Sequence, residues 1–265
     1  MRSQNAMTPT ATSAPPTPLP SQVGAATDPG LVRPKNEDYL RYEVPDDPLL
    51  VRARGSLFVV ADGVGGMGGG AVASAEAVHA VLQEYYLNPR GDAGRHLRRA
   101  IQHANFHVYN MRMGHPDFSG MQTTLTALAI RQDSYWLGHV GDSKAFLLRA
   151  GTLRQLTRDH TVVEEMRQLG LLDQRRAHQH PHRHLLTRTI GGEPIVAVDL
   201  RRGHAQPGDC FILATDGIFE HLAPEDVQVQ FENSPPDRAA AACVAEATRR
   251  GGYDNLTVLG VRLAL

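Results

Sequence analysis

The stretch VVADGVGGMGGGAVASAEAVHAV, residues 59–81, decides between two folds for this chain. An apolar run ends at Asp62, and six glycines follow within eight positions before an alanine-rich segment of helical pattern. Gly63, Gly65 and Gly68 spell G-x-G-x-x-G after an expected strand and before an expected helix, where a dinucleotide-binding loop belongs. The stretch is therefore either a cradle for a nucleotide's phosphates or a turn that follows a functional Asp62.

The elements around this stretch favour the second interpretation. The helix expected at 71–87 leads through a turn at 88–91 into another helix at 96–113, and not into a strand. The next apolar runs are joined by connections of only two to four residues, which antiparallel strands allow and parallel strands do not. These runs are 123–130, 134–140, 144–149 and 152–156. Without a β-α-β unit, a lone glycine fingerprint is a weak match to a dinucleotide fold.

The remaining pattern predicts further strands and helices in runs. Strands are expected before a turn at 28–30, from Asp38 onward, and at 57–61, 195–200, 210–215 and 256–264. Helices are expected at 161–169, 224–231 and 236–249, and the long polar segment 170–192 is expected to be a mobile flap. Strands in runs and helices in runs indicate an α+β fold, with antiparallel sheets and helices packed outside them.

Composition limits the domain organisation and the partners. Residues 1–21 are rich in Thr, Ser, Ala and Pro and are expected to form a disordered tail, which leaves 22–265 as one domain. Lys and Arg number 27 against 28 Asp and Glu, so neither nucleic acid nor a membrane surface is an expected partner. Cys210 and Cys243 form no C-x-x-C motif, so a disulfide framework and a cysteine zinc site are not expected. No apolar stretch suits export or anchoring, so the cytoplasm is the expected compartment.

Acidic residues recur where apolar runs stop. Asp62, Asp142 and Asp216 each follow such a run, Asp254 stands just before one, and Glu37 and Asp38 form a further acidic pair. Each aspartate alone could be an ordinary turn or cap residue. If the sheets bring several of them to one edge, however, their mutual repulsion needs a compensating positive charge. Nearby, only Arg33 and Lys144 offer one, so divalent cations are expected, and oxygen ligands favour magnesium or manganese over zinc.

Two such ions bridged by one carboxylate can activate a water and neutralise a transferring phosphoryl group. The chemistry this implies is hydrolysis of a phosphate ester. Arg33, four positions before Glu37, fits a bidentate clamp on the substrate's phosphate, although taken alone it would be interpreted as a surface arginine.

Seven motifs together resemble a known family, the metal-dependent PP2C-type serine/threonine phosphatases of bacterial type. They are RPKNED (33–38), VADGVGGM (60–67), GMQTT (120–124), VGDSKAF (140–146), LTRDHT (156–161), PGDCFILATDG (207–217) and YDNLTV (253–258). Any one motif is weak, but seven in the family's order and spacing are specific. The resemblance covers about residues 22–265 and implies a four-layer α-β-β-α sandwich with two central antiparallel sheets and a binuclear metal centre.

The resemblance also implies a role for each acidic residue. Asp62 would bridge the two ions, Asp216 and Asp254 would complete the ligands of one ion, and Glu37 with the carbonyl of Gly63 would serve the other. Asp142 would help Asp216 to hold a third, weaker ion. Asp38 would orient a water from behind the ligands, and Asn255 would support the geometry of Asp254.

Three positions depart from the family's pattern. Val64 stands where family members from eukaryotes often have a histidine that is a candidate general acid, as an apolar residue does in many bacterial relatives. The proton for the leaving group must then come from water or from elsewhere. Gln122 replaces a usual glycine, and His184 stands where bacterial relatives commonly have asparagine. The segment HQHPHRH (178–184) could bind a transition metal through alternate histidines, but solvated flap residues are the favoured interpretation. His79, His103 and His107 are expected to be ordinary helix residues.

The leading hypothesis is a monomeric enzyme that removes phosphate from serine and threonine in partner proteins, including a serine/threonine kinase or its targets. The alternative is a regulatory module of the same fold that binds phosphoproteins without turnover, and the intact acidic set disfavours it. Nucleotide binding is a distant third.

Overall fold

The computed structural model describes residues 20–65, 69–87, 91–173, 176–177 and 180–264. Most of the predicted tail, Gly68 of the fingerprint, the turn at 88–90 and His178 lie outside the described residues. Strand β1 (Pro20–Asp28) begins two residues before the predicted start of the domain.

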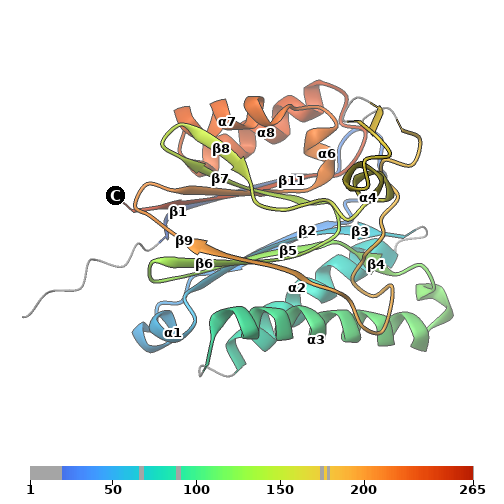
Figure 1. The fold of residues 1–265 in the computed structure, drawn as a ribbon, viewed down its shortest axis with the longest axis horizontal. Coiled ribbons are helices and arrows are strands. Elements are labelled where there is room, and N and C mark those ends of the chain that lie inside the picture. The colour runs from blue at the N-terminus through green and yellow to red at the C-terminus, as the bar shows by residue number, and fades with distance from the viewer. Residues whose placement is uncertain (1–19, 66–68, 88–90, 174–175, 178–179, 265) are drawn as a thin grey trace, which may run out of the picture.

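Two antiparallel sheets form the centre of the molecule (Figure 1). The first sheet has the order β1, β11 (Leu256–Leu263), β10 (Cys210–Ala214), β7 (Lys144–Arg149) and β8 (Thr152–Gln155). The second has the order β2 (Asp38–Glu43), β3 (Ser56–Val64), β5 (Leu125–Arg131), β6 (Ser134–Val140) and β9 (Asp199–His204), and the short β4 (Gln122–Thr123) also pairs with β3. The described partners of β3 are all antiparallel, which excludes the dinucleotide-binding topology.

Helices cover the outer face of each sheet (Figure 1). The long helices α2 (Gly69–Leu87) and α3 (Ala93–Gly114) lie on the second sheet, whereas α7 (Pro224–Asn233) and α8 (Pro236–Arg249) lie on the first. Shorter helices are α1 (Pro48–Ala53), η2 (Pro116–Phe118), α4 (Val162–Gln168) and α6 (Asp216–Phe219). The predicted four-layer sandwich is therefore confirmed. Within the described chain, no helix is both long and apolar enough to cross a bilayer.

Strand β3 shows why its sequence is apolar at consecutive positions. Successive side chains of a strand point to opposite faces. Leu57, Val59 and Ala61 pack in the cluster that faces α2 and α3, while Phe58 and Val60 pack between the two sheets. Because both faces are buried, each side chain contributes to a core, and full burial of one large apolar side chain is worth roughly 1.5–3 kcal/mol.

The strand predicted at 195–200 was placed too early. Residues 195–198 form no strand, and β9 begins at Asp199, opposite His139 of β6. The side chain of Asn105 donates to the carbonyl oxygens of Glu193 (3.0 Å) and Pro194 (3.2 Å), and Pro194 has no N–H to offer a sheet. As a result, Ile195 is 81% exposed. The apolar run alone could not reveal this competition for the backbone.

Candidate active site

The register of β2 and β3 places two of the predicted acids side by side. Asp38 is the direct partner of Asp62 in this antiparallel pair. Asp62 follows Val60 on the same strand face, and Val60 packs between the sheets. Both carboxylates therefore stand at the end of the space between the two sheets.

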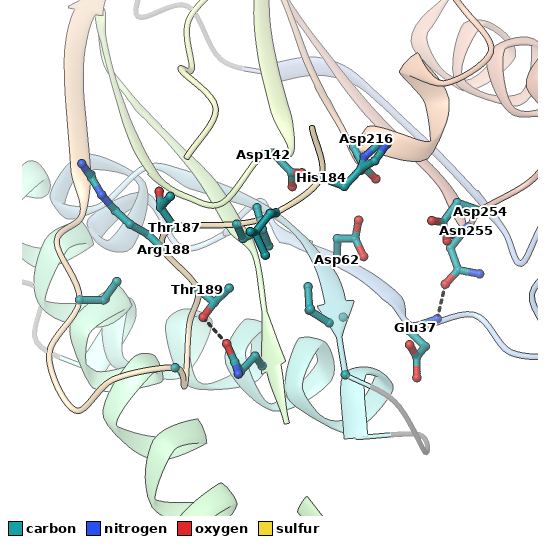
Figure 2. Close-up of a pocket in the computed structure, with 18 of the residues that line it drawn as sticks. Glu37, Asp62, Asp142, His184, Thr187, Arg188, Thr189, Asp216, Asp254 and Asn255 are labelled. Carbon is teal, nitrogen blue, oxygen red and sulfur yellow. Dashed lines mark hydrogen bonds and ion pairs between the residues drawn. The ribbon is translucent and has the colours of Figure 1, made fainter. Parts of the chain in front are cut away.

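The other predicted acids reach this end from neighbouring connections. Asp216 is the first residue of α6, two residues after β10, and Asp254 precedes β11 by two residues. Asp142 lies between β6 and β7. Figure 2 shows Asp62, Asp142, Asp216 and Asp254 around one opening. The open cavity there has a volume of about 1270 Å³, and every predicted site residue except Asp38 lines it: Arg33, Glu37, Asp62, Gly63, Asp142, Asp216, Asp254 and Asn255.

The glycines beside Asp62 allow close packing of the backbone. A Cβ on Gly63 would lie 2.4 Å from the carbonyl carbon of Gly70 and 2.6 Å from the carbonyl oxygen of Glu37. A Cβ on Gly70 would lie 2.9 Å from Oε2 of Glu37. The start of α2 can therefore approach the acidic residues only because these positions are glycine.

The GMQTT motif fixes the backbone of Asp62. The hydroxyl of Thr124 accepts a hydrogen bond from the N–H of Asp62 (2.9 Å), and the hydroxyl of Thr123 donates to the carbonyl of Asp62 (2.7 Å). Both threonines are fully buried. Gln122, one of the departures from the family's pattern, accepts a hydrogen bond from the Thr189 hydroxyl at 2.5 Å and lines the cavity.

Asp38 lies behind the cavity and is 7% exposed. Its Oδ2 accepts a hydrogen bond from the Thr215 hydroxyl at 2.8 Å, whereas its Oδ1 is buried without a hydrogen-bond partner in the described structure. Burial raises the pKa of Asp38 to about 7, and the neighbouring hydroxyls of Thr257 and Thr215 oppose that rise. An unpartnered buried carboxylate oxygen indicates that a polar or cationic group belongs beside it.

The remaining carboxylates differ in their electrostatic surroundings. Burial, followed by the neighbouring carboxylates Asp38 and Asp216, raises the pKa of Asp62 well above its usual range. Burial and Asp216 do the same for Asp142. Burial also acts to raise the pKa of Asp216, but the neighbouring His184 and Asp62 side chains outweigh it, so this pKa is lowered. Crowded acids of this kind favour a cation between them.

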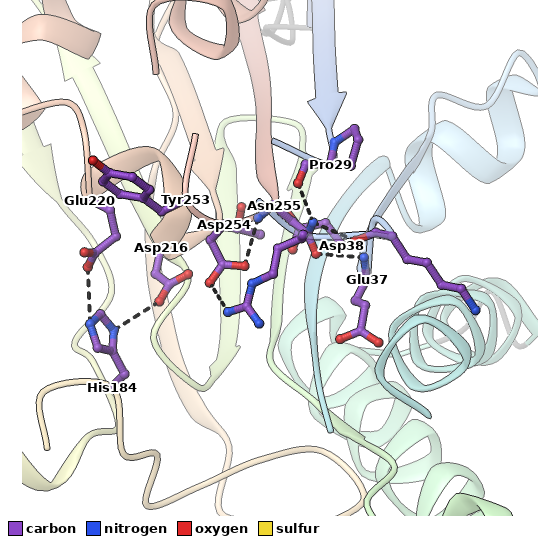
Figure 3. Close-up of polar contacts among 12 residues, drawn as sticks. Pro29, Glu37, Asp38, His184, Asp216, Glu220, Tyr253, Asp254 and Asn255 are labelled. Carbon is purple, nitrogen blue, oxygen red and sulfur yellow. Dashed lines mark hydrogen bonds and ion pairs between the residues drawn. The ribbon is translucent and has the colours of Figure 1, made fainter. Parts of the chain in front are cut away.

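Arg33 and Asn255 connect the Glu37 segment to the start of β11 (Figure 3). Arg33 donates to Oδ2 of Asp254 at 2.7 Å, with its side chain 54% exposed at the cavity. Oδ1 of Asn255 accepts the N–H of Glu37 at 2.8 Å, and its Nδ2 donates to the carbonyls of Pro29 and Lys35 at 2.9 Å each. The Asn255 side chain thus positions Glu37, while its backbone N–H binds Asp254 at 2.9 Å.

His184 is a contact that sequence reasoning missed. Its Nδ1 lies 3.6 Å from Oδ2 of Asp216, and its Nε2 lies 3.4 Å from Oε1 of Glu220 (Figure 3). The contact with the Asp216 carboxylate, together with the charge of Glu220, raises the pKa of His184. Lys144, in contrast, is paired with Asp159 at 2.5 Å. No sequence signal connects His184 with Asp216, because they are distant in the chain and meet only in the fold.

Among the histidines that the structure describes, His184 alone lines the cavity. His180, which is half-buried, accepts the N–H of the exposed His182 through Nδ1 at 3.2 Å. His79 contacts the Tyr39 hydroxyl at 3.0 Å, and His107 contacts Glu76 at 2.8 Å. His103 is exposed on α3, as expected of a helix-surface residue. Cys210 and Cys243 are buried free thiols.

The donor set fits hard divalent cations. The predicted ligands are carboxylate oxygens and one backbone carbonyl, the kind that magnesium and manganese prefer. Among the described residues, no three His, Cys, Asp and Glu side chains already converge as a cluster for one ion. The acids instead line a shared cavity, with Arg33 against Asp254 and His184 near Asp216. The orphaned Oδ1 of Asp38 behind them agrees with a cation-binding site.

Comparison with known proteins gives the family. The model of the Protein phosphatase 2C family matches residues 36–246. Serine/threonine protein phosphatase PstP of Mycobacterium tuberculosis is 33% identical over 235 residues, which are 89% of this chain and 43% of PstP. Serine/threonine phosphatase stp of Listeria monocytogenes is 33% identical over 240 residues, which are 88% of this chain and 92% of that protein. The chain thus spans less than half the length of the mycobacterial relative.

Solved structures agree with the sequence comparison. The crystal structure of the M. tuberculosis phosphatase PstP/Ppp has a TM-score of 0.82 and 32% identity, and covers 92% of this chain and 99% of that chain. The PstP catalytic domain in complex with two manganese ions has a TM-score of 0.78 and 30% identity, with coverage of 92% and 98%. The fold and the acidic cavity define the class of metal-dependent serine/threonine phosphatases. This chain belongs to the protein phosphatase 2C family.

Proposed function

We propose that this chain hydrolyses phosphoserine and phosphothreonine in proteins, with two manganese or magnesium ions bound in the acidic cavity. The observation that carries the proposal is the gathering of Glu37, Asp62, Asp216, Asp254 and Arg33 around one cavity at the end of both sheets. The complex of a related catalytic domain with two manganese ions supports the number of ions. A third, weaker ion is proposed at Asp142 and Asp216.

The residues of this chain divide the work of such a reaction. Bound ions would supply an activated water and neutralise charge on the phosphoryl group. We propose that Asp62 bridges them, that Asp216 and Asp254 bind one, and that Glu37 and the Gly63 carbonyl bind the other. Arg33, mostly exposed at the cavity, would move from Asp254 to the substrate's phosphate, where its planar guanidinium can bind two oxygens. Asp38 would orient water from behind.

Residue 64 is a valine and cannot donate a proton to the leaving oxygen. Val64 lines the cavity with an apolar side chain, 37% exposed. The proton would therefore come from solvent, which reaches the open cavity.

The test is metal-dependent turnover by the purified chain. Hydrolysis of an aryl phosphate and of a phosphothreonine peptide should require added manganese or magnesium and should stop with chelator. Asp62→Asn should lower kcat at least about a hundredfold, since it removes charge stabilisation where the phosphoryl group reacts. Asp133→Asn is the matched control. Asp133 lies in the turn between β5 and β6, at the end of the sheet opposite to the acidic cavity.

Full activity of Asp62→Asn would refute the bridging role. Binding of phosphopeptide without turnover by the wild-type chain would instead favour the non-catalytic module. Retention of the whole acidic set speaks against that module, since a binder has no need of it.

Substrates, assembly and location remain predictions. The proposed substrates are phosphoproteins, including a serine/threonine kinase or its targets, and the chain is proposed to act as a monomer in the cytoplasm. Capture of substrates from a lysate by an Asp254→Asn variant would identify the phosphoproteins concerned.

A further inference from the structure

The cavity extends from the carboxylates to a wall of apolar side chains. Figure 2 shows Thr187, Arg188 and Thr189 on the side of the cavity away from Asp254. The same cavity is also lined by the apolar side chains of Leu185, Leu186, Ile195, Val196 and Ala197. Leu185 is 53% exposed and Ile195 is 81% exposed, so both keep apolar surface in water.

The chain around Ile195 is held rigidly from behind. Asn105 of α3, which is 1% exposed, accepts the N–H of Gly191 at 2.9 Å and donates to the carbonyls of Glu193 and Pro194. Arg112 donates to the carbonyl of Gly192 at 2.8 Å. Ile190 is fully buried, and Val196 is 6% exposed. The buried Ile190 and Val196 and the hydrogen bonds from Asn105 and Arg112 thus hold the backbone on either side of the exposed Ile195.

These contacts fix the backbone around Ile195 and leave its side chain exposed. A single exposed apolar side chain is ordinary on a protein surface. Here the exposed Ile195 side chain lines the same cavity as the proposed phosphate site, on a preorganised segment, and Leu185 lines that cavity too. Covering such surface with another apolar group is favourable, and a preorganised segment loses little conformational freedom in doing so.

We propose that Ile195, in the cavity that Leu185 also lines, forms an apolar subsite that binds a large hydrophobic side chain close to the phosphoresidue of the substrate. This inference rests on the proposed function, because the occupant is the polypeptide whose phosphate lies among the carboxylates. The continuity of one cavity from Asp62 to Ile195 selects that occupant. A small aryl phosphate has no flanking residues and does not use the subsite.

The experiment compares phosphothreonine peptides in which one leucine is moved from three residues before to three residues after the phosphothreonine, in a Gly/Ser background. For the wild-type chain, leucine at one or two positions should raise kcat/KM about five- to tenfold over serine there, the range expected for partial filling of an apolar pocket. Ile195→Ser should reduce this ratio to about one, and Ile195→Leu should retain it.

The ratio compares two substrates on one enzyme preparation, so it does not depend on how much of a variant is folded. Leu49→Ser is the matched control, because Leu49 is 77% exposed on α1, outside the cavity. A flat leucine profile for the wild-type chain, or an unchanged profile for Ile195→Ser, would overturn the subsite. Absence of metal-dependent aryl phosphate hydrolysis would instead overturn the proposed function, so the two failures are distinguishable.

Discussion

His139 in β6 is a buried histidine whose polar partners fix its neutral form. Its Nδ1 lies 2.9 Å from the Thr126 hydroxyl, and its Nε2 lies 3.1 Å from the carbonyl of Arg158. Because a carbonyl only accepts, Nε2 carries the hydrogen and Nδ1 accepts from Thr126. Burial, followed by the neighbouring His160, lowers the pKa of His139 to about 3.

This histidine should make the fold acid-sensitive. The unfolded chain takes up a proton near pH 6.5, whereas the folded chain resists protonation until about pH 3. The stability that neutral His139 contributes is therefore full above pH 6.5 and is lost as the pH falls toward 3, by about 2 kcal/mol between pH 7 and pH 5. Urea unfolding of His139→Gln against wild type should show a smaller loss over that range. Equal losses would contradict the assignment.

Asn105 is a second residue whose effect is local and measurable. Asn105→Ala leaves the N–H of Gly191 and two carbonyls without their partner, so the free energy of unfolding should fall by about 1–3 kcal/mol. Asn110→Ala on the exposed face of the same helix is the control and should change it by less than about 0.5 kcal/mol. Similar urea midpoints for the two variants would refute the anchoring role.

At the scale of elements, β1 and α8 are packed without space for a side chain between them. A Cβ on Gly24 would lie 2.0 Å from the backbone nitrogen of Asp237 at the start of α8. Gly24→Ala should therefore push strand and helix apart and lower the free energy of unfolding by about 3 kcal/mol. Gly114→Ala at the end of α3, where a Cβ meets nothing within 4 Å, should be nearly neutral. Chemical denaturation of both variants measures these free energies of unfolding. An unchanged value for Gly24→Ala would show that α8 can shift freely.

The helices and strands also show which parts of the fold can be predicted from patterns in the sequence. The strand at 57–61 and the acids after it were predictable, because burial on both faces and Asp-Gly turns are local features. Strand β9 begins later than predicted because Asn105, about 90 positions earlier in the chain, binds the backbone carbonyls of Glu193 and Pro194. Likewise, the contact of His184 with Asp216 depends on how the flap crosses the end of the sheets. Such contacts depend on tertiary packing, which a local sequence pattern does not contain.

At the scale of the whole molecule, the acidic cavity links metal binding to stability. Ions that bind only the folded chain stabilise it, by about 2.7 kcal/mol at a hundred times the dissociation constant. Manganese should therefore raise Tm by roughly 5–10 °C for a domain of this size, and chelator should reverse the rise. Thermal unfolding followed by circular dichroism provides the measurement.

Asp62→Asn separates the two effects of that carboxylate. It should raise Tm without metal, because it relieves repulsion among buried acids, and it should lose most of the manganese shift. Asp133→Asn should keep the full shift. A wild-type Tm that is indifferent to manganese would refute the ion site.

The pairing of β1 with β11 has a consequence for how the protein is made. Thr27 and Thr257 are cross-strand partners whose hydroxyls lie 2.8 Å apart, separated by 230 positions in the chain. On the ribosome, β1 emerges before β11 and can pair with it only after the strands and helices between them have been synthesised. The second sheet can assemble meanwhile, whereas the first sheet closes last. Asp254 and Asn255 arrive with β11, so we expect no nascent chain lacking this strand to hold a complete cavity.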